Sequence, residues 1–164
     1  MVIAMFNEKC VFAGSFDPVT IGHMDIIGKC AMMFESVIVA IGVNDQKKYT
    51  FPLATRLKML QVACEKYSSV MVKSFDGYVA DFLKAENTRF YVRGIRNGKD
   101  IEFEEKSFEF SVKLYPEMET FFVNCSKDTK NISSSFVKQL IVEGKSIDKY
   151  IPPEALPVLK DFIK

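Results

Sequence analysis

Short apolar runs recur along the first three quarters of the chain, separated by segments in which apolar positions follow a helical spacing. The runs are rich in β-branched residues and lack polar alternation, which is typical of strands buried on both faces of a sheet. Two runs show the pattern clearly and three show it more weakly: 9–14 and 36–43, then 69–75, 90–94 and 118–124. The sequence therefore predicts five buried strands.

The segments between these runs predict helices. Residues 22–34 and 53–67 place apolar side chains three and four positions apart, as an amphipathic helix does. Residues 77–87 are a third candidate. The serines at 133–135 favour the start of another helix, because serine side chains cap free amide groups.

The C-terminal segment completes this pattern. Pro152 and Pro153 suit the entry to a helix, whereas Pro157 limits how regular that helix can be. Strands that alternate with helices of about 10–15 residues form right-handed βαβ units. We therefore expect an α/β fold: a doubly wound, Rossmann-like, five-stranded parallel sheet with helices on both faces and C-terminal helices, in a single domain over residues 1–164.

The loops at the carboxyl ends of these strands are the candidate binding regions. Ligands of doubly wound sheets bind at that edge, which here singles out 14–22, 44–52 and 93–100. A net charge of +1 provides no broad basic field, so we expect no nucleic-acid partner. Any phosphate must be bound by a few placed residues.

The composition is that of an ordinary globular protein, with 48% hydrophobic and 26% charged residues. No apolar run approaches the roughly 20 residues of a membrane span, so we expect no membrane partner. Residues 1–5 are apolar but too short for a signal peptide and have no basic lead. We therefore expect a cytoplasmic protein.

The cysteines carry no metal or disulfide signature. They stand at positions 10, 30, 64 and 125, without a C-x-x-C pair, and the chain has only one histidine. A zinc site of the usual Cys/His spacing needs more ligands than this. We expect reduced thiols that lie mostly in the core.

Two common phosphate-binding motifs are absent. No G-x-G-x-x-G occurs, and "GKS" at 144–146 does not complete a P-loop. A P-loop needs a glycine where this chain has Gln139, and it follows a strand rather than a helix. Phosphate binding must therefore rest on other residues.

The stretch "GSFDPVTIGH" at 14–23 contains the sole histidine. Gly14 ends a buried strand and allows close approach to the backbone, and Asp17-Pro18 favours a turn. His23 then opens a helix, whose free amides and dipole attract anions. A lone histidine is more often a surface or core residue, but this position lets the imidazole donate a hydrogen bond to a bound phosphate.

These residues resemble a known family. "TIGH" at 20–23 is similar to the T/H-x-G-H motif of nucleotidyltransferases, and "GSFDPVTIGHMDII" resembles the phosphopantetheine adenylyltransferases of bacteria. Two further blocks resemble that family in the same order, "YVRGIRNGKDIEFE" at 91–104 and "ISSSFVK" at 132–138. The resemblance covers nearly the whole chain from residue 9 and identifies a single nucleotidyltransferase domain.

The resemblance implies transfer of the adenylyl group of ATP to 4'-phosphopantetheine, which gives dephospho-coenzyme A and pyrophosphate in coenzyme A biosynthesis. It also implies Mg²⁺ with ATP, direct in-line displacement without a covalent intermediate, a homohexamer and coenzyme A as a feedback ligand. The chemistry suits the residues. The attacking phosphate is already an oxyanion, so catalysis needs positioning and charge stabilisation more than a general base.

By the same resemblance, three residues carry catalysis. His23 corresponds to the motif histidine that contacts ATP and stabilises the transition state. Lys47 corresponds to the lysine on the phosphate of phosphopantetheine, with Lys48 as the weaker candidate and a solvated loop as the alternative. Arg93, at the end of its predicted strand, corresponds to the arginine that binds this substrate, and its guanidinium suits an anion.

Further residues correspond to binding positions of the family. Ser15, in place of a common threonine, would contact both substrates, and Val79 would contact the pantetheine arm, although core packing is an equal alternative. Glu104 would contact ATP, with a solvent-facing helix as its alternative. The remaining candidates for ATP are Phe16, Gly94, Ile95, Arg96, Thr129, Lys130, Asn131, Ile132, Ser133, Ser134 and Ser135.

The chain departs from the family at two places. It has "KDTKN" at 127–131 where many relatives carry an aromatic residue near the nucleotide, and it has no tryptophan. Ile21 stands where asparagine is frequent. The way in which adenine is held, and the hydrogen bonding of the first turn, are therefore open at this point.

Two alternative functions remain. Another small nucleotidyltransferase could use nicotinate mononucleotide or glycerol-3-phosphate as acceptor, although "RGIR" and "ISSSFVK" favour phosphopantetheine. A non-catalytic nucleotide-binding protein would have lost the cationic set, yet His23, Lys47, Arg93 and Arg96 are all present. A tRNA synthetase is excluded by length and by the missing anticodon-binding region.

Overall fold

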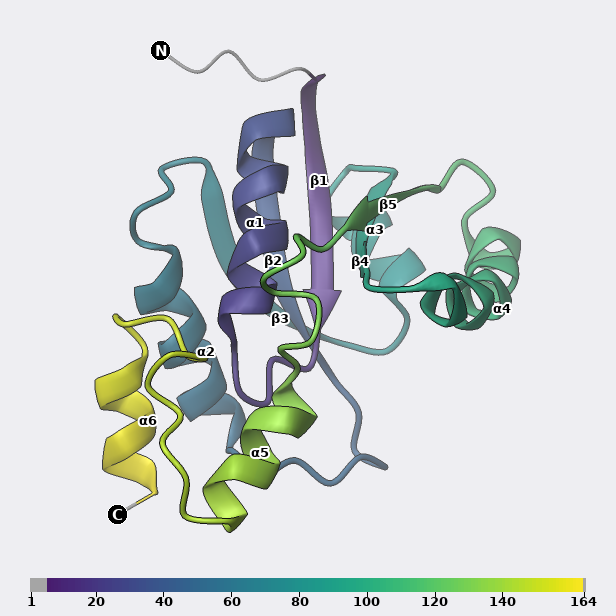
Figure 1. The fold of residues 1–164 in the computed structure, drawn as a ribbon. Coiled ribbons are helices and arrows are strands. Elements are labelled where there is room, and N and C mark those ends of the chain that lie inside the picture. The colour runs from purple at the N-terminus through teal and green to yellow at the C-terminus, as the bar shows by residue number, and fades with distance from the viewer. Residues whose placement is uncertain (1–5, 164) are drawn as a thin grey trace.

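The computed structural model describes residues 6–163, so the expectation for the segment 1–5 lies outside the described residues. Its centre is a parallel five-stranded sheet of order β3-β2-β1-β4-β5 (Figure 1). The strands are β1 (Phe6–Gly14), β2 (Phe34–Val43), β3 (Val70–Asp76), β4 (Phe90–Ile95) and β5 (Glu119–Asn124). This confirms the predicted fold class.

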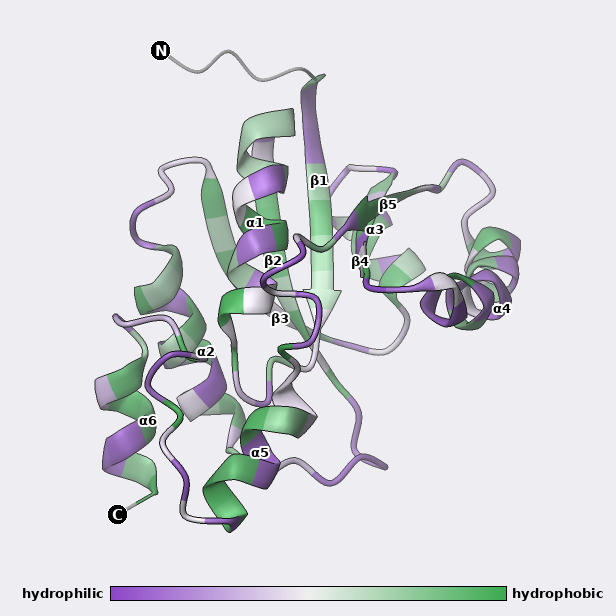
Figure 2. Cartoon of the chain, viewed as in Figure 1, coloured by the Kyte–Doolittle hydropathy of each residue, from purple (hydrophilic) through white to green (hydrophobic). Residues whose placement is uncertain are grey.

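Two apolar cores explain why the strands lack polar alternation. Successive side chains of β1 point to opposite faces, as in any strand, so Cys10 and Phe12 join one core while Val11 and Ala13 join the other. All four are buried. Figure 2 shows the hydrophobic stretch that fills the second half of β1, after a polar segment near its start.

The helices divide between these two cores. Buried side chains of α1, α2, α5 and α6 share the core of Cys10 and Phe12. Buried side chains of α3 lie in the other core, and α4 adds only the partly buried Leu114 to it. Helix α4 lies beside the β4–β5 edge (Figure 1). The bounds are α1 (Ile21–Met33), α2 (Leu53–Cys64), α3 (Val79–Ala85), α4 (Gly98–Leu114), α5 (Ser134–Val142) and α6 (Leu156–Phe162).

The last helix differs from the sequence-based expectation. It begins at Leu156, with Pro157 in its first turn, while Pro152 and Pro153 precede it in a turn. A proline in the first turn lacks only an N–H that has no helical partner there. Pro157 therefore fits the start of α6 and does not disturb its regularity, so that part of the expectation was wrong.

Helix α4 was predicted only as an alternative for the charged segment around Glu104. It is 17 residues long, and Ser111 is its one buried residue in the part of the chain that the structure describes. Asn97 caps it by accepting hydrogen bonds from the amides of Lys99 and Asp100. The helix is largely solvent-facing, yet it presents Glu104 to the sheet, as shown below.

The cysteines agree with the expectation of reduced thiols. Cys10, Cys30 and Cys64 are buried, Cys125 is partly buried, and all four are free. Within residues 6–163, no helix combines the length and apolar character needed to cross a membrane.

Candidate active site

The loop between β1 and α1 forms the centre of the site. Phe16 has a left-handed backbone, with φ of 45°, and its ring is 1% exposed. That ring lies 5.6 Å from the ring of Phe12 and 4.9 Å from the imidazole of His23. Phe16 therefore anchors the loop in the core, and its ring packs against the imidazole of His23.

Capping of α1 orients the imidazole. The Nδ1 atom of His23 accepts the backbone N–H of Thr20 at 3.0 Å, and the Thr20 hydroxyl accepts the N–H of His23 at 3.4 Å. Burial, followed by the positive charges of Arg93 and Arg96, lowers the pKa of His23 to about 4. His23 is therefore neutral near pH 7, and because Nδ1 is an acceptor, Nε2 carries the proton.

Arg93 is held by two neighbouring elements. Its guanidinium donates to the carbonyl of Ala13 at 2.7 Å and to Glu104 at 2.6 Å. Burial opposes its charge, but Tyr91 and Glu104 hold the pKa of Arg93 above its ordinary value. Strand β4 continues through Ile95 because it keeps pairing with β5, so Arg93 lies two residues before the strand end, not at it. Its Nε is buried without a partner among residues 6–163.

A cavity of about 340 Å³ gathers most of the predicted nucleotide residues. We call it the serine pocket, since it lies against the start of α5 as well as the start of α1. The predicted residues that line it are Ser15, Phe16, His23, Arg93, Gly94, Arg96, Ile132, Ser133, Ser134 and Ser135. Two helix N-termini therefore face one space, which suits bound anions.

The serines of this pocket have different tasks. Ser133 caps α5 by accepting the N–H of Phe136 at 3.1 Å. Ser134 donates its hydroxyl to the carbonyl of Pro18 at 2.8 Å, which joins α5 to the first loop. Capping of α5 therefore uses only one of the three serines. Ser135 lines the pocket as well.

A second cavity of about 480 Å³ adjoins the first. We call it the lysine pocket, and it contains the predicted residues Ser15, Lys47, Val79 and Arg93. Ser15 and Arg93 line both pockets, together with Ala13 and Gly14. The two spaces therefore share a wall formed by the end of β1 and by Arg93.

The structure separates the two lysine candidates. Lys47 and Lys48 are both exposed, but only Lys47 lines the lysine pocket with Arg93. Both lysines line a neighbouring hollow next to Phe162, so the difference between them is the contact of Lys47 with the lysine pocket. Lys47 is also the lysine that sequence reasoning favoured.

Some predicted residues lie outside both pockets. Lys130 and Asn131 line a third cavity, of about 350 Å³, that shares Arg96 with the serine pocket. Ile95 is buried and lines neither pocket. Glu104 is 13% exposed and pairs with Arg93, so it is placed to orient that arginine. The Thr129 hydroxyl donates to Asp25 at 3.1 Å.

Sequence reasoning missed two buried charged residues that join the loops. Asp17, 4% exposed, accepts the backbone N–H groups of Thr50 and Phe51, each at 2.9 Å. Arg56, 2% exposed, donates to the carbonyls of Ser15 at 2.8 Å and Phe51 at 3.0 Å. Arg56 stands at helical spacing from the apolar positions of 53–67, a signal that could have marked it.

Solved structures share this fold. A Vibrio parahaemolyticus protein with a nicotinate-nucleotide adenylyltransferase assignment has a TM-score of 0.73 at 16% identity, over 96% of this chain and 94% of that one. Plasmodium falciparum nicotinic acid mononucleotide adenylyltransferase, complexed with NaAD, has a TM-score of 0.68 at 19% identity, over 96% of each chain. At such identities the likeness concerns the fold alone.

Sequence comparison is more specific. A family model described as Cytidylyltransferase-like matches residues 11–140. The chain is 40% identical over 146 residues to the phosphopantetheine adenylyltransferase of Heliobacterium modesticaldum, covering 89% of this chain and 87% of that protein. It is 38% identical over 145 residues to that of Christiangramia forsetii, covering 88% and 95%. The chain therefore belongs to the cytidylyltransferase-like family and, within it, to the phosphopantetheine adenylyltransferases.

Proposed function

We propose that this protein transfers the adenylyl group of ATP to 4'-phosphopantetheine, releasing dephospho-coenzyme A and pyrophosphate in coenzyme A biosynthesis. The observation that carries the proposal is the pair of pockets that meet at Ser15 and Arg93. Relatives at 36–40% identity over most of the chain carry the name of this activity.

ATP fits the serine pocket. The start of α1 and the start of α5 both contribute to its lining, and free amides at helix N-termini bind phosphate oxygens. Arg96 lines the pocket while Asp100 holds its side chain at 3.1 Å. The same arginine also lines the third cavity with Lys130 and Asn131, which extends the cationic surface available to a triphosphate.

4'-Phosphopantetheine fits the lysine pocket. Lys47 and Arg93 supply positive charge for its phosphate, and Val79, Tyr78 and Phe110 supply apolar surface for its arm. Arg93 is fixed for this role by the carbonyl of Ala13 and by Glu104. The shared wall brings the two substrates to one place.

The reaction at this wall is a single displacement. An oxygen of the acceptor phosphate attacks the α-phosphorus of ATP and forms a new P–O bond, while the bond to the β-phosphate oxygen breaks. Pyrophosphate leaves with that electron pair, so no covalent enzyme intermediate is needed. His23, neutral and protonated at Nε2, donates a hydrogen bond to the α-phosphate, where negative charge builds.

Mg²⁺ is proposed to enter with ATP. Mg²⁺ in such sites is bound through one or two carboxylates and the phosphates of the substrate. Among the described residues, no group of three His, Cys, Asp or Glu side chains is placed to hold a metal ion. Asp17 and Glu104, which lie beside residues of the pocket walls, already accept hydrogen bonds from protein donors. We assign no step to the metal.

The test is release of pyrophosphate by purified protein with ATP, Mg²⁺ and 4'-phosphopantetheine. We expect release that depends on the acceptor, with dephospho-coenzyme A as the product. Nicotinate mononucleotide and glycerol-3-phosphate, tested in parallel, are expected to be inert. Release with one of these and not with phosphopantetheine would reassign the acceptor, and no release with any would favour a non-catalytic nucleotide-binding protein.

Family resemblance also leads us to propose a cytoplasmic homohexamer with coenzyme A as feedback ligand. Large apolar side chains on the surface of this chain suit contacts between copies: Met32 is 56% exposed, Phe103 73% and Val142 87%. Sedimentation of the purified protein tests the assembly, and inhibition of pyrophosphate release by added coenzyme A tests the feedback.

A further inference from the structure

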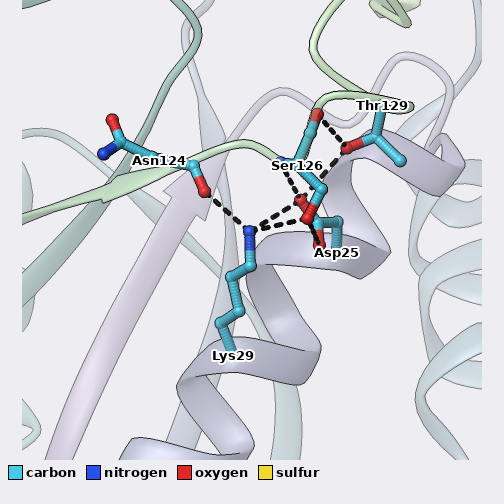
Figure 3. A network of polar contacts seen from close by, with 5 residues as sticks. All are labelled: Asp25, Lys29, Asn124, Ser126 and Thr129. Atoms are coloured by element: carbon cyan, nitrogen blue, oxygen red, sulfur yellow. Dashed lines mark hydrogen bonds and ion pairs between the residues drawn. The ribbon is translucent and has the colours of Figure 1, made fainter.

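A network of polar contacts joins α1 to the segment between β5 and α5, outside the serine and lysine pockets (Figure 3). Asp25 and Lys29 stand one helical turn apart on α1 and form an ion pair at 3.0 Å. Both reach across to residues about a hundred positions later in the chain. We refer to residues 124–132 as the bridging segment.

Asp25 binds this segment through both of its oxygens. Oδ1 accepts the Ser126 hydroxyl at 2.8 Å, and Oδ2 accepts the Ser126 backbone N–H at 2.7 Å and the Thr129 hydroxyl at 3.1 Å. The side chain is 16% exposed. Burial raises the pKa of Asp25, but these donors and Lys29 outweigh it, so the pKa lies below its ordinary value and the carboxylate is charged near pH 7.

Lys29 fixes the other end of the segment. Its ammonium donates to the carbonyl of Asn124, the last residue of β5, at 2.7 Å and to the Ser126 hydroxyl at 3.0 Å. Lys29 also pairs with Asp25, so within residues 6–163 the hydrogen-bond and ion-pair partners of its ammonium belong to the same network. Charge-assisted contacts of this kind hold geometry more firmly than neutral ones.

The bridging segment is itself one hydrogen-bonded unit. The backbone N–H groups of Thr129 and Lys130 donate to the carbonyl of Ser126 at 3.1 and 3.0 Å, and that of Ile132 donates to the carbonyl of Thr129 at 2.9 Å. Holding Ser126 therefore also holds Ile132, which lines the serine pocket. Contacts at one end of the segment are transmitted to the pocket wall.

The same face of α1 is in close contact with the end of the segment. A Cβ atom at Gly22 would lie only 2.7 Å from the carbonyl oxygen of Ile132. Gly22, Asp25 and Lys29 are spaced three and four residues apart, so they share one side of the helix. The segment therefore lies along α1 over two turns, fixed by charge at one end and by close packing at the other.

We propose that Asp25 and Lys29 are positioning residues for the nucleotide: they hold the bridging segment on α1 so that Ile132 and the serines at 133–135 form the wall of the serine pocket. The proposal rests on ATP occupying that pocket, as proposed above. It also reassigns Thr129, whose hydroxyl binds Asp25. Thr129 acts on the nucleotide through Asp25 and not by direct contact.

The first test compares binding of the two substrates by calorimetry. Removing a residue that orients a binding group typically costs about 10–100-fold in affinity, so Asp25→Ala is expected to weaken ATP binding by about tenfold. Binding of 4'-phosphopantetheine is expected to change less than about twofold. Asp81→Ala is the matched control, because Asp81 pairs with Lys84 on the surface of α3 and is 60% exposed. It is expected to leave both affinities unchanged.

A double-mutant cycle separates the two roles of Thr129. Groups that act through one another show non-additive effects, whereas independent contacts add. Thr129→Val is expected to weaken ATP binding about threefold in the wild-type protein and to have no effect in the Asp25→Ala protein. The Thr129 hydroxyl also reaches the carbonyl of Ser126 at 3.2 Å, so equal effects in both backgrounds would mean that Thr129 does not act through Asp25, and its proposed role would be overturned.

Failure of the positioning role and failure of the proposed function give different results. Absence of ATP binding by the wild-type protein would refute the proposed function itself. Normal ATP binding by folded Asp25→Ala protein, with wild-type binding intact, would refute the positioning role alone. Should circular dichroism show that Asp25→Ala is unfolded, Lys29→Met replaces it, with an expected loss of about threefold in ATP affinity; unchanged affinity there would equally overturn the proposal.

Discussion

His23 shows how backbone capping decides which ring nitrogen is free for chemistry. Nδ1 is occupied by the backbone N–H of Thr20, so the neutral ring keeps its proton on Nε2. The nearby charges of Arg93 and Arg96 help to keep the ring neutral. A neutral donor can stabilise developing charge without the cost of burying another cation in a site that already holds two.

We expect His23→Ala to lower kcat at least about 100-fold, because loss of one preorganised hydrogen-bond donor costs about that much. Thermal unfolding followed by circular dichroism should change little, since the Thr20 hydroxyl can still accept the backbone N–H of residue 23. Steady-state pyrophosphate release measures kcat. An unchanged kcat would remove His23 from the mechanism.

The single histidine also allows a direct pH measurement. Its imidazole NMR signals should titrate with a midpoint of about 4 in the free protein and higher once ATP is bound, because phosphate charge favours the cation. In the unfolded chain the pKa of His23 is near its ordinary value of 6.5. As pH falls, the unfolded chain therefore binds this proton at a higher pH than the folded chain does. The free energy of unfolding should therefore fall as pH falls from about 6.5 to 4 and be insensitive to this group above pH 7. A free-protein midpoint near 6.5 would contradict the burial argument.

The strands were predictable because runs of apolar, β-branched residues mark them in the sequence. Central strands β1 and β2 have long buried runs, but the edge strands β3 and β5 expose several residues each, so the expectation of five buried strands was wrong for these two. The helix ends and α4 were not, since α4 is largely exposed and its many charged residues read equally well as a solvated segment. The loops that carry the site followed from the rule for sheet edges. The directions of the side chains did not follow from it. Thr129 contacts Asp25 and Glu104 contacts Arg93, and in both pairs the partner lies on another element of the fold.

The loop between β2 and α2 carries Lys47, the residue that we expect to bind the phosphate of the acceptor. Lys47→Met is expected to raise KM for 4'-phosphopantetheine about tenfold or more with little change in KM for ATP, because Lys47 lines the lysine pocket and not the serine pocket. Lys48→Met is the matched control and should leave both values unchanged. Initial-rate kinetics with each substrate varied gives both constants. Equal effects of the two variants would mean that only the net charge of the loop matters.

At the scale of the whole molecule, the two substrate pockets depend on one buried connection. It joins the loop between β1 and α1 to the loop between β2 and α2. Asp17 binds the backbone of Thr50 and Phe51, and Arg56 binds the carbonyls of Ser15 and Phe51. Lys138 of α5 approaches Asp17 at 3.4 Å, so the wall of the serine pocket joins the same connection. The loop of Lys47 and the loop of His23 are thereby held as one body.

Arg56→Met tests this connection, because methionine fills much of the same volume without the donors. Two buried carbonyls then lose their partners, and unsatisfied buried acceptors cost about 1–3 kcal/mol each, so chemical denaturation should show a free energy of unfolding lower by at least about 1 kcal/mol. Since the guanidinium joins both loops, KM should rise for ATP and for 4'-phosphopantetheine together, unlike the one-sided effects expected for Lys47 and Asp25. Arg89→Met, which alters an arginine near the start of β4, away from both pockets, is the control and should leave both constants unchanged. A variant that loses stability while both KM values stay at wild-type level would show that each loop keeps its shape alone, and the joint control of the two pockets by Arg56 would be refuted.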